Sequence, residues 1–415
     1  MQNNNNINSF ATVTASYWAF MLTDGALRML VLLHFHELGV SAIQLAYIFL
    51  IYEFMGIITN FSGGFLAKRF GLASTLYLGL ILQILALTLL ALLPTNLSLF
   101  SMLSYAIFTQ AISGIAKDLT KTSAKACVKI LSPKNKDDQL FKWIAKLTGS
   151  KNAIKGFGFF LGCALISNVG FSAGLAILGG LLLIILLLLL MFLPLNLPAG
   201  TKSVKINDVI SSDRRVKLLA LARSLLFGAR DTWFVVGIPL FFIEILSNGS
   251  NVDNKYAFFF IGSFMAVWTI FYGLVQAWAP SFFKNISEKN LVQYSVYWLF
   301  VLILSTVLLA ITSLIVSSAS SPTSIYVIVI GLFVFGGIFA VNSSLHSFLI
   351  LYFTSPERAP LDVGFYYMSN AAGRLVGTFL SGASYQLGGF TLCLFLSAFL
   401  LIFSFFPTVL LNKNN

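Results

Sequence analysis

Charged side chains occur inside segments of this sequence that are otherwise apolar. Asp24 and Arg28 lie four residues apart in the first such segment, so on a helix they share one face. The seventh segment contains Arg223, Arg230 and Asp231. A charge at the centre of a membrane helix costs about 2.5 to 3.5 kcal/mol, so such charges usually line water, pair with one another or bind a charged solute. These residues therefore predict a polar site inside an apolar bundle.

The balance of these charges predicts the sign of the solute. Other apolar segments contain Glu53, Lys117, Asp118, Lys155 and Arg374. Taken together, six cations stand against four carboxylates in the apolar segments. A cavity with surplus fixed positive charge favours an anion and repels a cation. The planar fork of arginine also binds phosphate or arsenate oxygens in a bidentate manner, so we expect an anionic solute.

Three arginines are the first candidates for contact with that anion. Arg28, Arg230 and Arg374 fall near the middle of their apolar segments. The alternative is that each arginine is neutralised by a neighbouring carboxylate, for instance Arg28 by Asp24, in a structural ion pair. Both interpretations stay open at the level of sequence.

Lysines in the fourth apolar segment recur every four residues, at Lys117, Lys121, Lys125 and Lys129. On a helix this spacing places them along one face. We interpret Lys117 and Lys121 as part of an electropositive path into the site, together with Lys155 near the start of the fifth segment. Lys125 and Lys129 fit a simpler interpretation, in which the ammonium groups reach out to the membrane surface.

Carboxylates and one histidine in the apolar segments could neutralise the cations or carry protons. A counter-ion role is the favoured interpretation for each of them: Asp24, Glu53, Asp118, Asp231 and His346. The sequence contains no HExxH motif and no paired cysteine and histidine cluster, which are the usual signs of a metal site. We therefore expect neither a metal nor another cofactor.

Uncharged polar residues concentrate late in the chain. Asn342 lies in the tenth apolar segment, and the eleventh contains Tyr366 and Asn370, which shares a helical face with Arg374. Hydroxyl and amide groups of this kind could bind the hydroxyls of a sugar-like or glycerate solute. They are equally common as hydrogen-bonding groups between membrane helices.

Membrane helices must position these residues. Hydrophobic residues make up 58% of the 415 residues and charged residues 10%, whereas a soluble domain carries about a quarter of its residues as charges. Each crossing of a bilayer needs a helix of about 20 mainly apolar residues. The sequence predicts twelve such helices, at residues 11–36, 42–67, 73–93, 97–128, 148–168, 172–194, 217–246, 256–282, 291–316, 324–353, 361–386 and 389–411.

Basic residues predict how these helices are oriented, because lysine and arginine collect in cytoplasmic loops. They occur here in the gaps after even-numbered helices, for example Lys68 and Arg69 after the second and Lys284 and Lys289 after the eighth. The odd-numbered gaps carry almost none, with Lys255 as the exception. We therefore expect a multi-pass protein of the cell inner (plasma) membrane with both termini in the cytoplasm.

The longest hydrophilic gap lies near the midpoint of the chain and divides the helices into two sets of six. This division is typical of transporters built from two repeats. We predict a cytoplasmic tail at 1–10, an N-terminal six-helix bundle at 11–194, a cytoplasmic linker at 195–216, a C-terminal six-helix bundle at 217–411 and a cytoplasmic tail at 412–415. The net charge of +12 does not indicate nucleic acid binding, because the basic residues are scattered between apolar segments.

Two glycine motifs have structural rather than catalytic interpretations. Gly170, Ser172 and Gly174 match a hydrolase nucleophile elbow, which needs a strand, a turn and a helix. Here the motif falls between two predicted membrane helices. Gly158 and Gly162 form a GxxxG motif, which predicts close helix packing. The sequence shows neither the catalytic constellation of a membrane enzyme nor the polar lipid-facing groove of a scramblase, so we do not expect an enzyme.

The stretch GGFLAKRFGLAS, between the second and third predicted helices, is similar to the cytoplasmic loop motif of the major facilitator superfamily. Gly64, Arg69 and Gly71 fit that motif and are expected to act in a gating loop. Lys68 stands where the motif normally has an acidic residue, which puts the usual gating ion pair in doubt. The resemblance implies an all-α integral membrane fold with twelve transmembrane helices in two six-helix halves.

Longer strings, among them LTDGALRMLVLLHFHELG, FGARDTWFVVGIP and VGFYYMSNAAGRLVGTFLSG, resemble the organoarsenical efflux permeases of arsenic-resistance operons, the J-type arsenical permease family. The likeness runs over nearly the whole chain. It implies export of 1-arseno-3-phosphoglycerate by alternating access. It also implies functional coupling to the glyceraldehyde-3-phosphate dehydrogenase that makes this compound when arsenate replaces phosphate. The product releases arsenate outside the cell, so the resemblance implies arsenate resistance.

An ordinary organic phosphate, or another small organic anion, is the alternative cargo for a permease or exchanger of this kind. Export of an anion from a negative interior is electrically downhill by about 2.3 kcal/mol per charge for each 100 mV, so uniport is sufficient. We expect the small anionic substrate and the lipid bilayer as binding partners, no nucleic acid, and a monomer.

Overall fold

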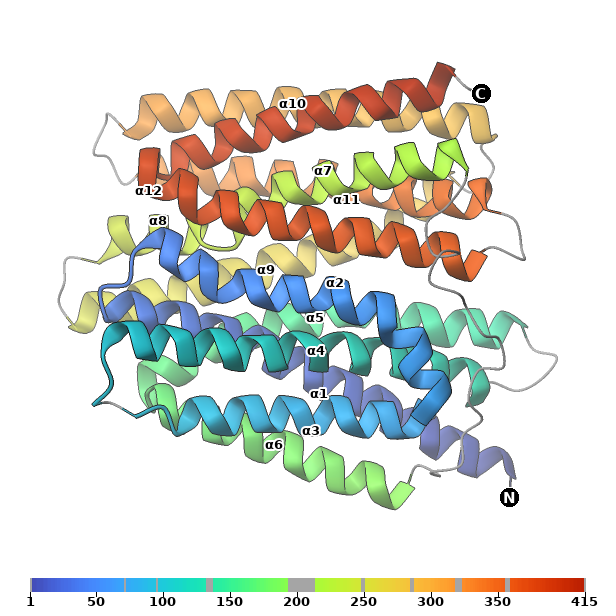
Figure 1. Cartoon of the computed structure of the whole chain (residues 1–415). Coiled ribbons are helices and arrows are strands. Elements are labelled where there is room, and N and C mark those ends of the chain that lie inside the picture. Colours follow the sequence, from blue (N-terminus) through green and yellow to red (C-terminus); the bar gives the residue numbers. More distant parts are fainter. Residues whose placement is uncertain are drawn as a thin grey trace. The chain divides into compact units, whose positions relative to one another are not determined.

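The structure is a computed structural model and describes residues 2–70, 72–94, 96–131, 137–192, 213–247, 251–283, 287–317, 323–354 and 359–413. These residues are helical almost throughout, and no strand occurs among them (Figure 1). The helices are α1 (Gln2–Glu37), α2 (Ala42–Phe70), α3 (Leu72–Ala91), α4 (Leu99–Leu131), α5 (Asp137–Asn168), α6 (Phe171–Phe192), α7 (Arg214–Phe234), α8 (Gly237–Leu246), α9 (Asn251–Phe283), α10 (Glu288–Ser317), α11 (Thr323–Phe353) and α12 (Ala359–Lys413). The expected all-α class is confirmed.

Ten stretches of the described residues are long and apolar enough to cross a membrane. One of them, Asp362–Leu411, contains two predicted helices, because the backbone of α12 leaves the helical conformation at Gly388 and Gly389. Gly389 has a φ of 62°, a left-handed conformation that glycine adopts without steric cost. Figure 1 shows α12 folding back on itself, so the eleventh and twelfth predicted helices are its two arms.

The seventh predicted helix is broken in the structure. α7 ends at Phe234 and α8 begins at Gly237. Ser381 on α12 accepts hydrogen bonds on its Oγ from the backbone N–H groups of Val236 and Gly237, both at 3.1 Å. Pro239 follows in the first turn of α8, where the N–H that proline lacks has no helical acceptor. Two backbone N–H groups at the break are therefore satisfied by a side chain of α12.

Two further boundaries differ from the predicted ones. α1 begins at Gln2, so the helix continues through the residues predicted to form a tail. The fifth predicted helix is the second part of α5, which begins at Asp137 and is not among the ten membrane-length stretches. Each of the twelve predicted ranges nevertheless overlaps a helix of the described residues, and the seventh overlaps two.

The chain forms two compact units, which we describe separately. The first contains Met1–Leu38, Ile51–Val204 and Asn254–Thr269, and the second contains Gly39–Leu50, Lys205–Asp253 and Ile270–Asn415. The units follow the two predicted halves except for one segment from each: the beginning of α2 belongs to the second unit, and the first part of α9 belongs to the first.

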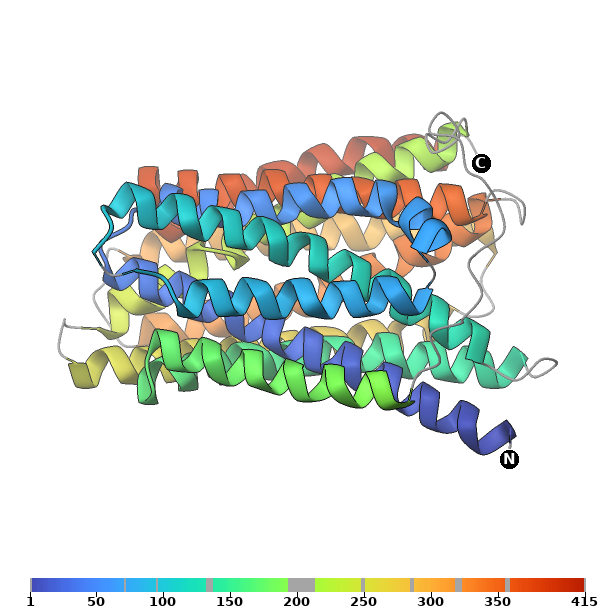
Figure 2. The ribbon, with the colours of Figure 1, turned by 60° about the horizontal axis from the view of Figure 1, so that its bottom comes forward.

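In the first unit, α1 packs against α4, α5 and α6, and α3 packs against α4 and α6. Figure 2 shows α3 lying between α4 and α6. A Cβ atom added to Gly158 would lie 3.2 Å from Cα of Gly25, and one added to Gly162 would lie 2.8 Å from Cα of Ala26. The close packing predicted from the GxxxG motif is therefore confirmed. It brings α5 against the charged face of α1.

In the second unit, α12 packs along α7, α8, α10 and α11. Glycines allow α7 and the first arm of α12 to approach closely. A Cβ atom added to Gly228 would lie 3.0 Å from the carbonyl oxygen of Gly373, and one added to Gly377 would lie 2.9 Å from Cβ of Asp231. This close approach places the polar residues of the two helices within hydrogen-bonding distance.

Candidate functional site

A network of ion pairs joins α1, α2, α4 and α5 in the first unit. Lys155 Nζ on α5 donates to Asp24 Oδ2 on α1 at 2.5 Å. The hydroxyl of Tyr52 on α2 donates to the other carboxylate oxygen of Asp24. The pairing of Asp24 with Arg28, considered from their spacing, is thus replaced by bonds from Asp24 to neighbouring helices.

Arg28 pairs with a carboxylate on α2. Its Nη2 lies 3.2 Å from Glu53 Oε1, and the two side chains are only 6% and 1% exposed. Lys117 on α4 lies 3.5 Å from the other oxygen of Glu53 and 3.9 Å from Asp118 Oδ2. Lys121 donates to Asp118 Oδ1 at 3.2 Å. Glu53 therefore lies between two cations, and Lys117 lies between two carboxylates.

The first-unit cluster keeps a small positive surplus. The ammonium of Lys117 lies 4.0 Å from the ring centroid of Tyr52, a cation–π contact that adds to its ion pairs. Counted over the described residues, four cations meet three carboxylates: Arg28, Lys117, Lys121 and Lys155 against Asp24, Glu53 and Asp118. The cluster therefore has a net charge of +1, although each of its cations has a carboxylate partner.

A second cluster lies around Asp231 in the second unit. Arg230 Nε donates to Asp231 Oδ1 at 2.7 Å, and Arg374 Nε on α12 donates to Asp231 Oδ2 at 3.0 Å. The carboxylate side chain is 1% exposed. Two guanidinium groups thus share a single negative charge, which leaves a net charge of +1. Arg230 and Arg374 were both expected to contact the solute, and both have this carboxylate as a partner.

Arg223 is a further buried arginine on α7, and its hydrogen-bond partners are neutral. It is 4% exposed. Its Nε donates to Asn370 Oδ1 at 3.2 Å, and its Nη1 donates to the carbonyl and hydroxyl oxygens of Ser343 at 2.9 and 3.0 Å. Within the part of the chain that the structure describes, Arg223 makes no ion pair with a carboxylate. Its guanidinium is therefore buried without a carboxylate counter-ion among these residues.

Arg223 was not among the residues expected from the sequence to bind the solute. A signal was present, because Arg223 and Arg230 are seven residues apart, about two helical turns, and so share one face of α7. On α12, Asn370 and Arg374 share a face in the same way. In the structure these faces of α7 and α12 lie against each other, with Arg223 bonded to Asn370 and Asp231 bonded to Arg374.

Other polar residues expected at the site surround Arg223 or lie on the same helices. The ring centroid of Tyr366 is 5.0 Å from Cζ of Arg223. Asn342 donates from Nδ2 to the carbonyl of Ile338 in its own helix at 3.1 Å. His346 is fully buried, and neither ring nitrogen has a hydrogen-bond partner among the described residues. Tyr366 and Asn370 therefore belong to the Arg223 group, and Asn342 is bonded within α11.

Several predicted positions fall where the structure gives little or no information. Gly64 and Arg69 lie on the helical backbone of α2, and Gly71 lies outside the described residues. The side chains of Arg69, Lys125 and Lys129 are outside the described set as well. The gating loop and the interfacial position of the two lysines therefore stay predictions.

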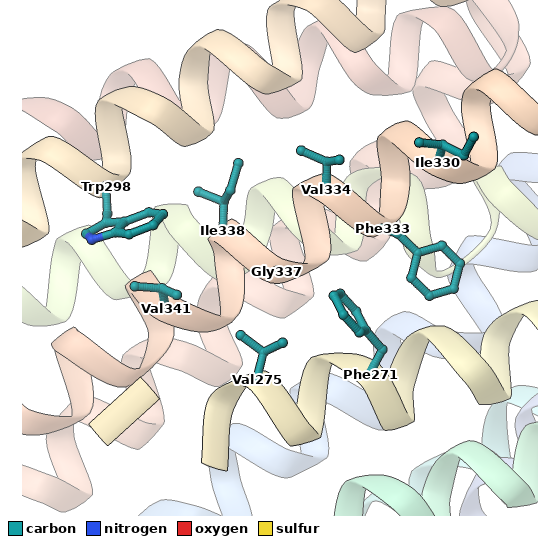
Figure 3. Close-up of a pocket in the computed structure, with 9 residues that line it drawn as sticks. All are labelled: Phe271, Val275, Trp298, Ile330, Phe333, Val334, Gly337, Ile338 and Val341. Atoms are coloured by element: carbon teal, nitrogen blue, oxygen red, sulfur yellow. The ribbon is translucent and has the colours of Figure 1, made fainter. Parts of the chain in front are cut away.

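The structure also contains an open cavity of about 510 Å³ in the second unit. Its lining is apolar and comes from α9, α10 and α11: Phe271, Val275, Trp298, Ile330, Phe333, Val334, Gly337, Ile338 and Val341. Figure 3 shows the rings of Phe271 and Phe333 close to each other, with centroids 5.4 Å apart. None of the charged residues described above lines this cavity, so it is separate from the candidate site.

Neither a metal site nor a nucleophile elbow emerges from the described residues. They contain no group of three or more His, Cys, Asp or Glu side chains that could hold a metal ion. Gly170 has a φ of 84° and forms the turn before α6, and Ser172 is exposed in the first turn of that helix. The GFSAG motif therefore joins two helices and lacks the strand of a nucleophile elbow.

Comparisons with known proteins give the family and the fold. The family model described as Major Facilitator Superfamily matches residues 13–300, more than half of the chain. Two solved structures, a mutant of the nucleoside transporter NupG and a bacterial homologue of the iron transporter ferroportin in an inward-facing state, are similar to this chain. Each is 14% identical with a TM-score of 0.71, and each alignment covers 98% of this chain and 99% of the other. A comparison with curated protein sequences found no match.

Proposed function

This chain belongs to the major facilitator superfamily and is a membrane transporter, and we propose that it exports the anionic organoarsenical 1-arseno-3-phosphoglycerate by alternating access, conferring arsenate resistance. The proposal places the protein in the inner membrane with both termini in the cytoplasm. A glyceraldehyde-3-phosphate dehydrogenase in the same cell supplies the cargo.

The single observation that supports this proposal best is the charge of the buried residues in the second unit. Its described intramembrane groups include the three arginines Arg223, Arg230 and Arg374. Asp231 forms ion pairs with Arg230 and Arg374, whereas Arg223 is bonded to neutral groups. These four groups together carry a net charge of +2 within a bundle of apolar helices, where fixed charges act strongly because the surroundings are weakly polar. Such a field attracts an anion and repels a cation.

The choice of an arsenylated phosphoglycerate rests on the resemblance to the organoarsenical permeases, and the charges agree with it. This compound carries a phosphate and an arsenate group, so it is strongly anionic. One of the two similar structures is described as a nucleoside transporter and the other as a bacterial homologue of an iron transporter. At 14% identity they show the fold alone. The positive surplus disfavours a metal cation such as iron as cargo here.

Arsenate resistance in a sensitive strain tests the proposal. The strain is transformed with the transporter, with the dehydrogenase, with both or with neither, and growth is followed over a range of arsenate concentrations. We expect resistance only when both are present, because the dehydrogenase makes the cargo. Resistance conferred by the transporter alone would contradict the organoarsenical assignment.

Transport into everted vesicles distinguishes the proposed cargo from an ordinary organic phosphate. Dehydrogenase, NAD, glyceraldehyde 3-phosphate and arsenate outside the vesicles generate the arsenylated compound, and arsenate accumulation inside is measured. 3-Phosphoglycerate supplied without arsenate is the matched control. Uptake of 3-phosphoglycerate at a rate equal to that of the arsenylated compound would overturn the proposed cargo in favour of a general organic phosphate permease.

A further inference from the structure

Three polar side chains converge on the hydroxyl of Ser343 on α11, and two of them donate hydrogen bonds to it. Arg223 Nη1 on α7 and Gln276 Nε2 on α9 each lie 3.0 Å from Ser343 Oγ, and the hydroxyl of Tyr272 on α9 lies 3.5 Å from it. Ser343 itself is fully buried. A neutral hydroxyl is a modest acceptor for a guanidinium, whereas hydrogen bonds to a charged oxygen are roughly twice as strong.

We propose that these residues form a subsite for one oxyanion. Before the ligand binds, the hydroxyl of Ser343 accepts the hydrogen bonds. After it binds, an oxygen of the oxyanion accepts them instead. The ligand class is a soluble phosphate or arsenate ester. Assigning the subsite to one end of an arsenylated phosphoglycerate rests on the proposed function. The oxyanion subsite itself rests on the geometry within the second unit.

The charge of Arg223 supports an oxyanion rather than a neutral ligand. Among the described residues of this unit, the carboxylate that pairs with buried arginines is Asp231, whose two oxygens accept from Arg230 and Arg374. Among the described residues, the hydrogen bonds of Arg223 use Nε and Nη1, and none uses Nη2. Guanidinium groups bind phosphate oxygens with adjacent N–H groups in a fork. Arg223 therefore has both the charge and a donor edge for such a ligand.

Two aromatic rings lie within cation–π distance of the Arg223 guanidinium. Its Cζ lies 4.0 Å from the ring centroid of Phe227 and 5.0 Å from that of Tyr366. Phe339 packs next to Phe227 and Tyr272, with centroids 5.1 and 5.7 Å apart. A guanidinium that already packs against aromatic rings loses little freedom when it binds a ligand, and the apolar surroundings strengthen its attraction to an anion.

His346 is a second and independent observation at the same place. It lies three residues after Ser343 and therefore on the same face of α11. The imidazole is 0% exposed, and among the described residues neither nitrogen has a hydrogen-bond partner. A buried polar group without a partner destabilises the folded protein, so its retention calls for an explanation. A neutral imidazole donates one hydrogen bond, which an oxyanion beside Arg223 can accept.

Substitution of Ser343 by aspartate tests the subsite directly. The full-length protein is placed in phosphatidylcholine nanodiscs, and binding of ³²P-phosphate and of radiolabelled 3-phosphoglycerate is measured by equilibrium dialysis. S343D puts a carboxylate among the converging donors. We expect it to weaken binding of both probes at least about tenfold and to raise the unfolding temperature, because the carboxylate takes the bonds of the ligand.

Variants of Arg223 provide a second test of the subsite, which can be used even if S343D does not fold. R223K retains the charge without the fork, and R223Q removes the charge, so we expect binding about tenfold weaker in R223K and weaker still in R223Q. R215A is the matched control, because Arg215 lies on the same helix, is 37% exposed and pairs with Asp213. Its affinity should stay within about twofold of the wild type. Unchanged affinity in folded R223K and R223Q would overturn the subsite and leave these bonds a purely structural role.

Two further experiments show whether the oxyanion that binds belongs to a soluble solute or to a lipid headgroup. Nanodiscs containing phosphatidylglycerol provide a lipid phosphate, and its complete displacement of both soluble probes would overturn the assignment to a solute. The vesicle assay with wild-type protein is run in parallel. Loss of probe binding in the Arg223 variants, combined with equal wild-type transport of arsenylated and plain phosphoglycerate, would support the subsite and overturn only the proposed cargo.

Discussion

Arg374 on α12 donates from Nε to Asp231 Oδ2 on α7 at 3.0 Å, and this bond joins two residues that are 143 positions apart in the sequence. The other oxygen of Asp231 accepts from Arg230, its neighbour on α7. Asp231 therefore has one partner from its own helix and one from α12. The two arginines can be tested separately, because removing either leaves the carboxylate with a cation.

The variant R374A is expected to abolish arsenate resistance without loss of membrane expression. Arg230 still neutralises Asp231 in this variant, so the fold is preserved while the cationic surplus falls by one charge. Growth on arsenate together with an immunoblot of the membrane fraction measures both effects. R374K is the control, because it restores the charge without the fork and should restore part of the resistance. Full resistance in R374A would remove Arg374 from the site.

The bond between Lys155 and Asp24 is expected to stabilise the packing of α1 against α5. Either D24N or K155M leaves one buried charge without its partner and should destabilise the protein by about 3 kcal/mol, whereas the double variant leaves neither charge and should cost less than the sum. Thermal unfolding of the four purified proteins in detergent gives the interaction energy. Strict additivity of the two single effects would show that the pair contributes nothing.

Gly377 is expected to be intolerant of a side chain. A Cβ atom there would lie 2.9 Å from Cβ of Asp231, so G377A must push α12 away from α7 and weaken the bond from Arg374 to Asp231. We expect a lower unfolding temperature and lower transport. Gly364 on the same helix is the matched control, since nothing lies within 4 Å of an added Cβ. G364A should leave stability unchanged or raise it by up to about 1 kcal/mol, because alanine favours the helix. Equal behaviour of the two variants would contradict close packing at Gly377.

Ser381 is expected to hold the break between α7 and α8. Its hydroxyl accepts from two backbone N–H groups, so S381A leaves both donors buried without this acceptor, at a cost of about 1 to 3 kcal/mol each. Hydrogen–deuterium exchange over residues 234–240 should accelerate in S381A. Ser384 is a suitable control, because its hydroxyl donates to the carbonyl of Leu380 in the same helix. Exchange in S381A no faster than in S384A would show that the break is stabilised by other groups.

Hydropathy was sufficient to predict where the helices lie, because each crossing of the bilayer needs about 20 apolar residues whatever its neighbours are. It could not predict the interruption of the seventh helix at Val235 and Val236, since both residues are apolar and the acceptor for the break comes from Ser381 on α12. The predicted gap between the last two helices, at residues 387–388, falls next to the turn that the structure makes at Gly388 and Gly389.

The sequence could not predict which side chains pair with the charged residues of the membrane helices. Spacing within one helix suggested that Arg28 pairs with Asp24, but side chains from other helices decided the outcome, with Glu53 bonded to Arg28 and Lys155 bonded to Asp24. Arg223 was not predicted to bind the solute for the same reason. Its neutral surroundings depend on Ser343 and Asn370, which lie more than 100 residues away in the sequence.

The exchange of segments between the two compact units has a consequence for biogenesis. Gly39–Leu50 is synthesised early but belongs to the unit that contains α12, where Gly382 would place a Cβ atom 2.5 Å from Cβ of Ala46. Residues 254–269 are synthesised after the linker but belong to the unit that contains α5. Neither half of the chain can therefore complete its own packing during translation. A gene split at the linker should give fragments that are degraded when expressed singly and accumulate in the membrane only when both are made in the same cell.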